Sequence, residues 1–335
     1  EGQLALVTDY LLRAIRRVTR SPSTINIDAD TALLDLGLDS LMGLELRTSI
    51  HTQLGVDLPL SLVWQDLSVG RLAEVVVASL GTSSTPLPTH EILVPLQPNG
   101  SKSPVVCVHP IHGTVHVYQA LAAALGKDRP VVGLRAPGLE EDETPLSNVD
   151  SLAESHIATL AANGIDGTVH LVGYSFGAAV AHAMATKLGA RVGSLTLLDG
   201  SPSPTAEVDI DSASTQLVAR SFGLGPGDCS REALVAYAQE QSLFPDAEAV
   251  AQVDRMLAVV RAHLHAFTTH APVSFDGAVQ LMRTLSGHPD EADDLGWGPL
   301  AKAIEVRTVD CAHEELLSPP RLNLVVDALK ELLDE

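Results

Sequence analysis

The sequence contains few cysteines and few aromatic residues. Of its 335 residues, three are cysteines and 3% are aromatic. The cysteines, Cys107, Cys229 and Cys311, are odd in number and widely separated, so they build neither a disulfide framework nor a Cys-x-x-Cys metal site. We therefore expect a reducing compartment, with the cytoplasm as the location.

Basic residues are scarce as well. Lysine and arginine number 21 against 42 for aspartate and glutamate, which gives a net charge of −21. A field of this sign repels nucleic acid and anionic membranes. The longest apolar runs, such as residues 75–80, are far shorter than the roughly 20 residues that a membrane-spanning helix needs. Nucleic acid is therefore excluded as a partner, and no membrane span is expected.

The length predicts more than one domain, because 335 residues exceed what a single hydrophobic core usually organises. Hydrophobic residues make up 45% and charged residues 19%, a composition typical of folded chains. Small polar residues and two prolines interrupt the periodic sequence at Gly81–Thr89. We therefore expect domains at residues 1–81 and 92–335, joined by a linker at 82–91.

The first 81 residues carry helical patterns only. Apolar residues between Leu4 and Val18 recur at intervals of three and four, which places them on one helix face. Asp39-Ser40 and Ser68 are residue types that suit a helix N-terminus, and an apolar stretch follows each of them. A small all-α bundle is expected here.

From Val94 onward the pattern changes to short β-branched runs that alternate with alanine-rich helical stretches. Such runs indicate a mostly parallel sheet with helices on both faces. About 80 residues rich in helix signals separate the fourth run from the fifth, so we expect a helical lid at about 203–272. The six runs are Val105–Val108, Val131–Leu134, Val169–Val172, Leu195–Leu198, Val279–Leu281 and Ile304–Val309.

A Gly-x-Ser-x-Gly string at residues 173–177 lies between a strand run and a helical stretch, the context of a nucleophile elbow. The serine, Ser175, needs a base and an orienting carboxylate. Asp199 ends the fourth run and His313 follows the last, in the order Ser, Asp, His of an α/β-hydrolase. Asp290, after the fifth run, is the alternative acid.

The string His109-Pro-Ile-His-Gly113 directly follows the first strong strand run. A loop at that position supplies one backbone N–H for a developing oxyanion, and the residue after the nucleophile supplies the other. We expect these donors to be the main-chain amides of Ile111 and Phe176. The histidines of this stretch invite a metal reading, but no cysteine or carboxylate completes a tetrahedral set, so no metal is expected.

Leu36-Gly-Leu-Asp-Ser-Leu-Met42 carries a different signature. An exposed serine, Ser40, at a helix start presents its hydroxyl to a modifying enzyme without needing a local base. The alternative is an ordinary helix cap.

One apolar face in the expected lid bears on specificity. Its residues recur at intervals of 4, 3, 4 and 3, as in a long amphipathic helix. Such a face either packs wholly into core or shares part of its surface with a bound acyl chain. Its members are Val253, Leu257, Val260, Leu264 and Phe267.

Together these motifs resemble an acyl carrier protein followed by a type I thioesterase, the C-terminal pair of fatty acid and polyketide synthases. The carrier motif matches residues 36–41, and the strings at 109–113, 173–177 and 199–202 are most similar to the animal fatty acid synthase thioesterase. His112 departs from that pattern, in which animal synthases often carry an acid. The resemblance implies a four-helix carrier bundle, an α/β-hydrolase with a helical lid, and 4′-phosphopantetheine attached covalently to Ser40.

It also implies a serine triad, Ser175, His313 and Asp199, that releases an acyl or polyketide chain by hydrolysis. Macrolactonisation is the alternative outcome, and a catalytically inactive carrier-docking module is a further one. The implied partners are upstream synthase domains and a phosphopantetheinyl transferase.

Overall fold

The computed structural model describes most of the chain. The described residues are 2–19, 27–33, 36, 40–54, 56, 58, 68–80, 92–204, 207–225, 227, 229–241, 243–244, 248–286 and 292–333. By its internal contacts the chain divides into two compact units, residues 1–91 with 219–254 and residues 92–218 with 255–335. The expected linker at 82–91 lies outside the described residues.

The first 80 residues form the expected helices. These are α1 (Gly2–Val18), α2 (Ser40–Leu54) and α4 (Val69–Leu80). The periodic face of α1 is buried in one hydrophobic cluster with Leu46 and Ile50 of α2 and Leu72 and Val76 of α4. The apolar residues of α1 whose spacing predicted a helix face are thus the residues that pack into this core. The four-helix form of the bundle stays a prediction, because the residues between α2 and α4 are largely outside the described part.

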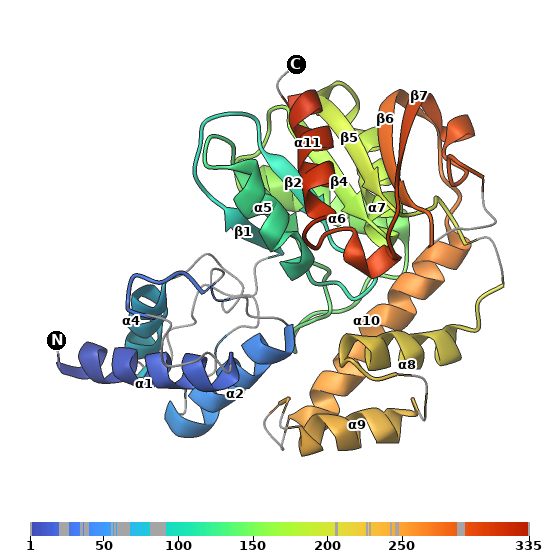
Figure 1. The fold of residues 1–335 in the computed structure, drawn as a ribbon. Helices are drawn as coiled ribbons and strands as arrows, with labels where there is room; N and C mark the ends of the chain where they lie inside the picture. The colour runs from blue at the N-terminus through green and yellow to red at the C-terminus, as the bar shows by residue number, and fades with distance from the viewer. Residues whose placement is uncertain are drawn as a thin grey trace. The chain divides into compact units, whose positions relative to one another are not determined.

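A seven-stranded sheet forms the centre of the second unit (Figure 1). Its strand order is β1-β3-β2-β4-β5-β6-β7, and every pair is parallel except β1 with β3. Each of the six expected strand runs is confirmed. The strands are β1 (Leu93–Gln97), β2 (Val105–Val108), β3 (Val131–Leu134), β4 (Val169–Tyr174), β5 (Val192–Leu198), β6 (Phe275–Thr284) and β7 (Ala301–Val309).

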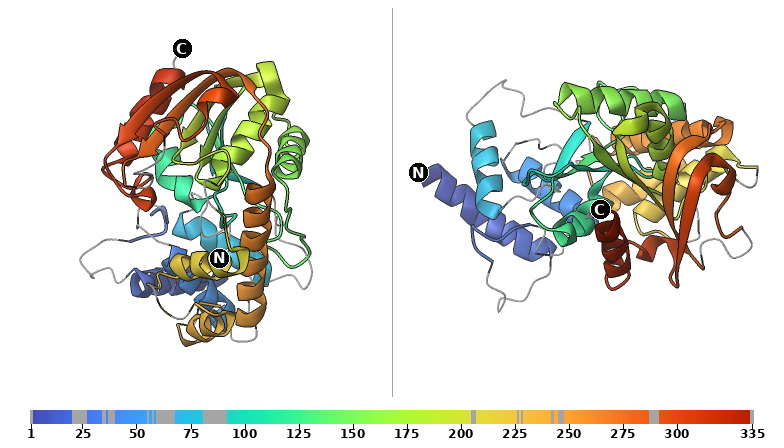
Figure 2. Two further views of the ribbon diagram at one scale, coloured as in Figure 1. Left: turned by 90° about the vertical axis from the view of Figure 1, so that its right-hand side faces the viewer. Right: turned by 90° about the horizontal axis from the view of Figure 1, so that it is seen from above.

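Successive strand residues point to opposite faces of this sheet, and each face has its own core. In β2, Val106 and Val108 belong to a cluster with α6 (Val149–Ala162) and α7 (Phe176–Leu188). Val105 and Cys107 belong to a second cluster with α5 (Gln119–Leu125) and α11 (Leu322–Leu333). The view from above in Figure 2 shows these three layers. The continuous apolar runs are explained by burial on both sides.

Strand β1 was not expected from the sequence. It is a short antiparallel edge strand with Pro95 at its centre, and its register shifts between Pro95 and Gln97. Proline cannot donate to a ladder, so within sheets it is confined to edges and bulges. A proline inside a five-residue run therefore obscures the strand signal.

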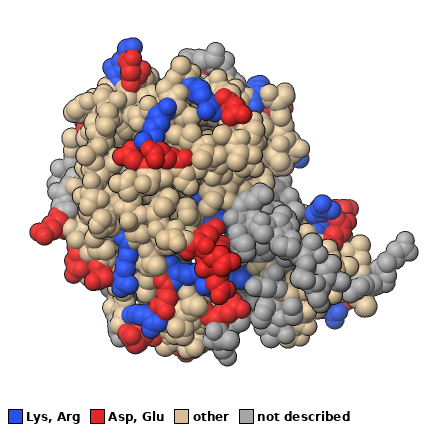
Figure 3. Space-filling model, turned by 180° about the vertical axis from the view of Figure 1, so that it is seen from behind, with Lys and Arg blue, Asp and Glu red and all other residues tan. Residues whose placement is uncertain are grey.

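The connection from β5 to β6 contains the expected helices. They are α8 (Ile210–Ser221), α9 (Arg231–Glu240) and α10 (Ala249–Thr269). Shorter 3-10 segments occur elsewhere, at His116–Tyr118, Gly189–Arg191, Gly298–Leu300 and His313–Glu315. No helix in the described ranges is long and apolar enough to cross a membrane. Side chains of both charge signs occur on the face shown in Figure 3.

Candidate active site

Ser175 connects β4 to α7 through a sharp turn. Its backbone has φ 57° and ψ −127°, a positive φ that is unfavourable for a residue with a side chain. Its N–H donates to the carbonyl of Leu198 at 2.9 Å, which ties the turn to the end of β5. The turn has the strand, serine and helix order of a nucleophile elbow.

Two glycines allow the elbow to close. A Cβ at Gly177 would lie 2.6 Å from the carbonyl oxygen of Val108, and one at Gly200 would lie 2.1 Å from that of Ser175. Both distances are too short for any side chain. The glycines in the sequence strings at 173–177 and 199–202 are therefore requirements of backbone packing around the serine.

Asp199 follows β5 with its carboxylate buried. Oδ1 accepts from the Thr284 N–H at 2.6 Å, and Oδ2 accepts from the Thr284 hydroxyl at 2.7 Å. Oδ2 also lies 2.6 Å from Nδ1 of His313. Burial alone would raise the pKa of Asp199, but the hydrogen bonds from His313 and Thr284 bring it below the ordinary value. The carboxylate is thus ionised and fixed against the imidazole.

His313 opens the 3-10 turn after β7, and Tyr174 holds it from a second side. The two rings stack with centroids 4.8 Å apart, and the Tyr174 hydroxyl donates to the His313 carbonyl at 2.8 Å. Because Nδ1 donates to Asp199, the other ring nitrogen, Nε2, is the one left to accept a proton. The structure therefore brings two of the three expected triad residues into direct contact and places Ser175 on the adjacent elbow.

The residues that orient this pair were missed by the sequence analysis. Thr284 ends β6, two residues beyond Met282, which pairs with Leu198 at the end of β5. This register, which the sequence pattern does not report, places Thr284 beside Asp199. Asp290, the alternative acid, lies outside the described residues.

Residues 109–113 form the loop after β2, here named the oxyanion loop. The Gly113 N–H donates to the Pro110 carbonyl at 2.9 Å and closes a turn around Ile111. Phe176 is the first residue of α7, and amides in the first turn of a helix have no intrahelical partner. Because the Cα of Gly177 lies against the start of this loop, Ile111 and Phe176 come from neighbouring segments.

The histidines of the oxyanion loop have structural partners. His109 is fully buried, and its ring lies edge-on to His156 of α6 and stacks with His263 of α10. Burial lowers the pKa of His109 to about 3. Within the described ranges, no group of three or more histidine, cysteine or acidic side chains is arranged to hold a metal ion.

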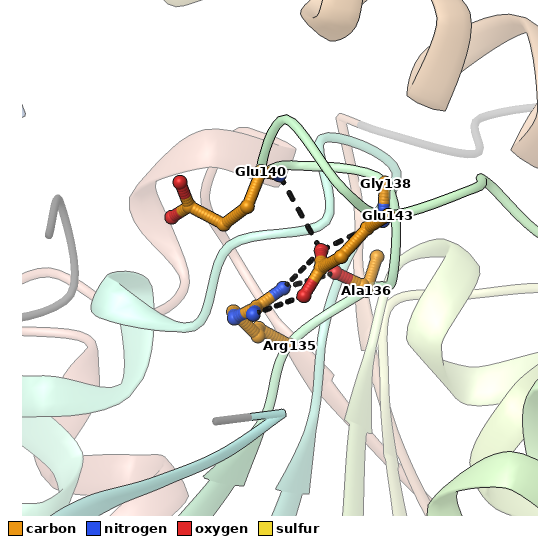
Figure 4. A network of polar contacts seen from close by, with 5 residues as sticks. All are labelled: Arg135, Ala136, Gly138, Glu140 and Glu143. Atoms are coloured by element: carbon orange, nitrogen blue, oxygen red, sulfur yellow. Dashed lines mark hydrogen bonds and ion pairs between the residues drawn. The ribbon is translucent and has the colours of Figure 1, made fainter. Parts of the chain in front are cut away.

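A second loop, residues 135–143, contacts the oxyanion loop. The guanidinium of Arg135, at the end of β3, forms a paired contact with the Glu143 carboxylate at 2.5 and 2.8 Å (Figure 4). The same carboxylate accepts from the Gly138 N–H at 2.9 Å. The Ala136 N–H donates to the Gly113 carbonyl at 2.8 Å. The bidentate ion pair thus holds the turn of residues 135–143 together. The bond from Ala136 to Gly113 ties this turn to the oxyanion loop.

The expected specificity face lies on α10 and is buried. Leu257 and Val260 are almost fully inaccessible, while Phe267 is partly buried and meets Phe176 edge-on at 5.9 Å. Phe267 therefore contacts the side chain of Phe176, whose main-chain amide is an expected oxyanion donor.

The sheet order, the elbow and the Asp-His pair define an α/β-hydrolase fold. The protein-family model of the thioesterase domain matches residues 103–333. The family model of the phosphopantetheine attachment site matches residues 9–76. The chain belongs to the thioesterase domain family and carries a phosphopantetheine attachment domain ahead of it. This domain indicates covalent 4′-phosphopantetheine as the cofactor.

Similar proteins agree with this architecture. The chain is 28% identical over 323 residues to a dimodular nonribosomal peptide synthase of Bacillus subtilis, covering 92% of this chain and 13% of that protein. It is 26% identical over 302 residues to enterobactin synthase component F of Escherichia coli K12, covering 87% of this chain and 22% of that protein. It therefore spans less than a quarter of either relative.

Among solved structures, a four-domain nonribosomal peptide synthetase bound to AMP and glycine aligns with a TM-score of 0.67 and 20% identity. The match covers 95% of this chain and 25% of that one. At this identity the likeness shows the fold alone.

These relatives correct one expectation. They are nonribosomal peptide synthetases, and not the fatty acid or polyketide synthases that the short motifs predicted. The physical reason is visible at Gly177 and Gly200, where backbone contact excludes any side chain. Strings of this kind report the geometry of the elbow and not the chain that is released.

Proposed function

We propose that this chain is the carrier and release part of a nonribosomal peptide synthetase, in which the thioesterase frees a peptidyl chain through an acyl-enzyme on Ser175. The observation that carries the proposal is the short contact between His313 and the buried Asp199, beside a serine on a strained elbow. The partners would be upstream synthetase modules and a phosphopantetheinyl transferase.

Ser40 is proposed as the attachment site of the cofactor. It is the first residue of α2, at an end of the helix, while Leu46 and Ile50 further along α2 are buried in the core. A position at a helix start fits a group that must reach away from the bundle. Once attached, phosphopantetheine would supply a thiol that carries the peptidyl chain as a thioester.

In the proposed acylation step, Ser175 Oγ attacks the thioester carbonyl and His313 Nε2 takes the serine proton. Asp199 stabilises the imidazolium that forms, and the amides of Ile111 and Phe176 donate to the oxyanion. The C–S bond then breaks, and His313 returns the proton to the leaving sulfur. The products are an ester on Ser175 and the free thiol.

The second proposed step hydrolyses the ester on Ser175. His313 takes a proton from water as the water oxygen attacks the carbonyl, and the proton then passes to Ser175 Oγ as the ester bond breaks. The product is a free acid. A hydroxyl of the same chain that reached the ester before water would give a lactone by the same steps.

The test uses the whole chain loaded with a peptidyl group through a phosphopantetheinyl transferase. We expect the wild type to release the peptide plus one water, Ser175→Ala to load without release, and Ser40→Ala to remain unloaded. Intact-protein mass spectrometry follows loading, and the product mass separates an acid from a lactone, which is one water lighter. Loading of Ser40→Ala would refute the attachment site, and undiminished release by Ser175→Ala would refute the nucleophile.

The helix face on α10 gives a prediction about chain length. Each buried methylene contributes about 0.8 kcal/mol, so a face that borders the chain should set a length optimum. We expect Phe267→Trp to shift preference toward shorter chains while a short surrogate reacts almost as before. Single bulky substitutions at the other four positions complete the scan.

His265→Trp, exposed on the same helix, is the control and should leave the chain-length profile unchanged. Unaltered profiles at all five positions of the face would mean that it serves only as core.

A further inference from the structure

The backbone around Ile111 is fixed through two carbonyls. The Pro110 carbonyl accepts from Gly113 N–H and lies 2.9 Å from Nδ1 of His109. The peptide between Pro110 and Ile111 is planar, so the Ile111 N–H points in the direction opposite to the Pro110 carbonyl. Fixing that carbonyl therefore also fixes the direction of the N–H. The next peptide plane is held at the Ile111 carbonyl, which lies 2.7 Å from Nδ1 of His263.

His263 reaches this loop from α10, within the connection between β5 and β6. A carbonyl oxygen only accepts, so Nδ1 must carry the hydrogen of a neutral ring. Nε2 is buried and meets no hydrogen-bond partner among the described residues. The one polar function that the ring performs there is donation to Ile111.

The ring of His263 also contacts both sides of the expected oxyanion hole. It stacks with His109, which begins the oxyanion loop, at 4.8 Å and 20°. It stacks with Phe176, which follows the nucleophile, at 4.9 Å and 19°. One side chain of the insertion therefore touches the two segments that must be aligned for two amides to meet one oxygen.

A second bridge joins the same loop to another helix of the insertion. Nε2 of His112 lies 3.1 Å from the carbonyl of Leu217 in α8. His112 is also the residue at which the sequence departs from the animal thioesterase pattern. The oxyanion loop is thus bonded to α8 by its own side chain and to α10 by its backbone.

We propose that His263 is a positioning residue of the oxyanion hole. It holds the Ile111 peptide so that the amide of Ile111 faces the reacting carbonyl when α10 is packed on the loop. The inference rests on the proposed function, in which that amide stabilises the oxyanion. His263 touches no reacting atom and acts through Ile111.

The test compares two replacements of His263 in the full chain. His263→Phe retains an aromatic ring but removes the donor, whereas His263→Asn places an amide N–H near the position of Nδ1. Removing one oxyanion donor outright costs about 10²- to 10³-fold in turnover. We expect misalignment in His263→Phe to slow acylation about 10- to 100-fold with KM nearly unchanged, and His263→Asn to recover most of the rate.

The measurement is burst kinetics with a short acyl thioester surrogate. The burst amplitude counts active sites, so partial unfolding lowers the amplitude. The burst rate constant reports acylation, so mispositioning of the oxyanion hole lowers the rate constant. The affinity for a boronic acid that mimics the tetrahedral oxyanion should fall with the rate constant. His265→Phe, two residues along α10 and exposed, is the matched control and should behave as wild type.

A wild-type acylation rate constant in His263→Phe would overturn the inference and leave the proposed function intact. Turnover by the wild type without any acyl-enzyme on Ser175, as judged by intact-protein mass spectrometry of quenched reactions, would overturn both. If His263→Phe does not fold, His263→Gln replaces it, because glutamine places its amide near Nε2 instead. His263→Asn must then acylate faster than His263→Gln, and equal rates would refute the positioning role.

Discussion

Replacing Asp199 by asparagine is expected to lower turnover by about four orders of magnitude. The donors to this carboxylate include the N–H and hydroxyl of Thr284 and Nδ1 of His313. An asparagine has one oxygen, and the immovable N–H of Thr284 claims it. The amide NH₂ then faces His313, whose Nδ1 must become the acceptor.

That reversal moves the imidazole hydrogen to Nε2, the nitrogen that has to take the serine proton. The side chain stays in place but holds the wrong tautomer. Steady-state turnover of a thioester surrogate measures the loss, and Asp290→Asn is the matched control because it removes the alternative acid. A mild effect at Asp199 together with a severe one at Asp290 would reverse the assignment.

Acidification is expected to destabilise the hydrolase unit steeply below pH 6.5. His109, His156 and His263 are fully buried in mutual contact. Burial lowers the pKa of His109 and of His156 to about 3 from the ordinary 6.5, with Arg135 nearby as a further cause. Burial also lowers the pKa of His263 well below 6.5.

These folded-state pKa values lie below those of the unfolded chain. At any pH between the two sets of values, the unfolded chain therefore binds more protons than the folded chain. The stabilisation is complete above pH 6.5 and is lost progressively as the pH falls toward 3. These three groups alone contribute a slope of about 4 kcal/mol per pH unit. A typical domain has only about 5 to 15 kcal/mol in total, so unfolding near pH 5 is expected.

Urea unfolding at a series of pH values measures this slope. Trp64→Phe leaves Trp297, which is buried in the hydrolase core, as the one tryptophan reporter. His156→Leu should lower the slope by about one proton, because neither ring nitrogen of His156 has a hydrogen-bond partner among the described residues. An unchanged slope in that variant would contradict the role of the histidines.

Local pattern was enough to predict six of the seven strands of the sheet and the triad candidates. Runs such as Val105–Val108 are apolar at every position because both faces are covered, and Asp199 follows such a run directly. The residues that orient the site could not be found this way. Thr284 is 85 residues from Asp199 and His263 is 152 from Ile111, so their contacts depend on strand register and helix packing. No periodicity within one segment reports such pairs.

The position of the insertion, between β5 and β6, has a consequence for how sequences of this fold can diverge. β5 and β6 are parallel neighbours, so the chain must cross from one end of the sheet to the other between them. Residues 199–274 occupy a crossing that the topology already requires. Doubling the length of such a connection costs only about 0.6 kcal/mol in chain entropy. Helices can therefore be gained, lost or exchanged between Leu198 and Phe275 while the strands on either side keep their register, provided that the contacts of the insertion with residues 109–113 survive.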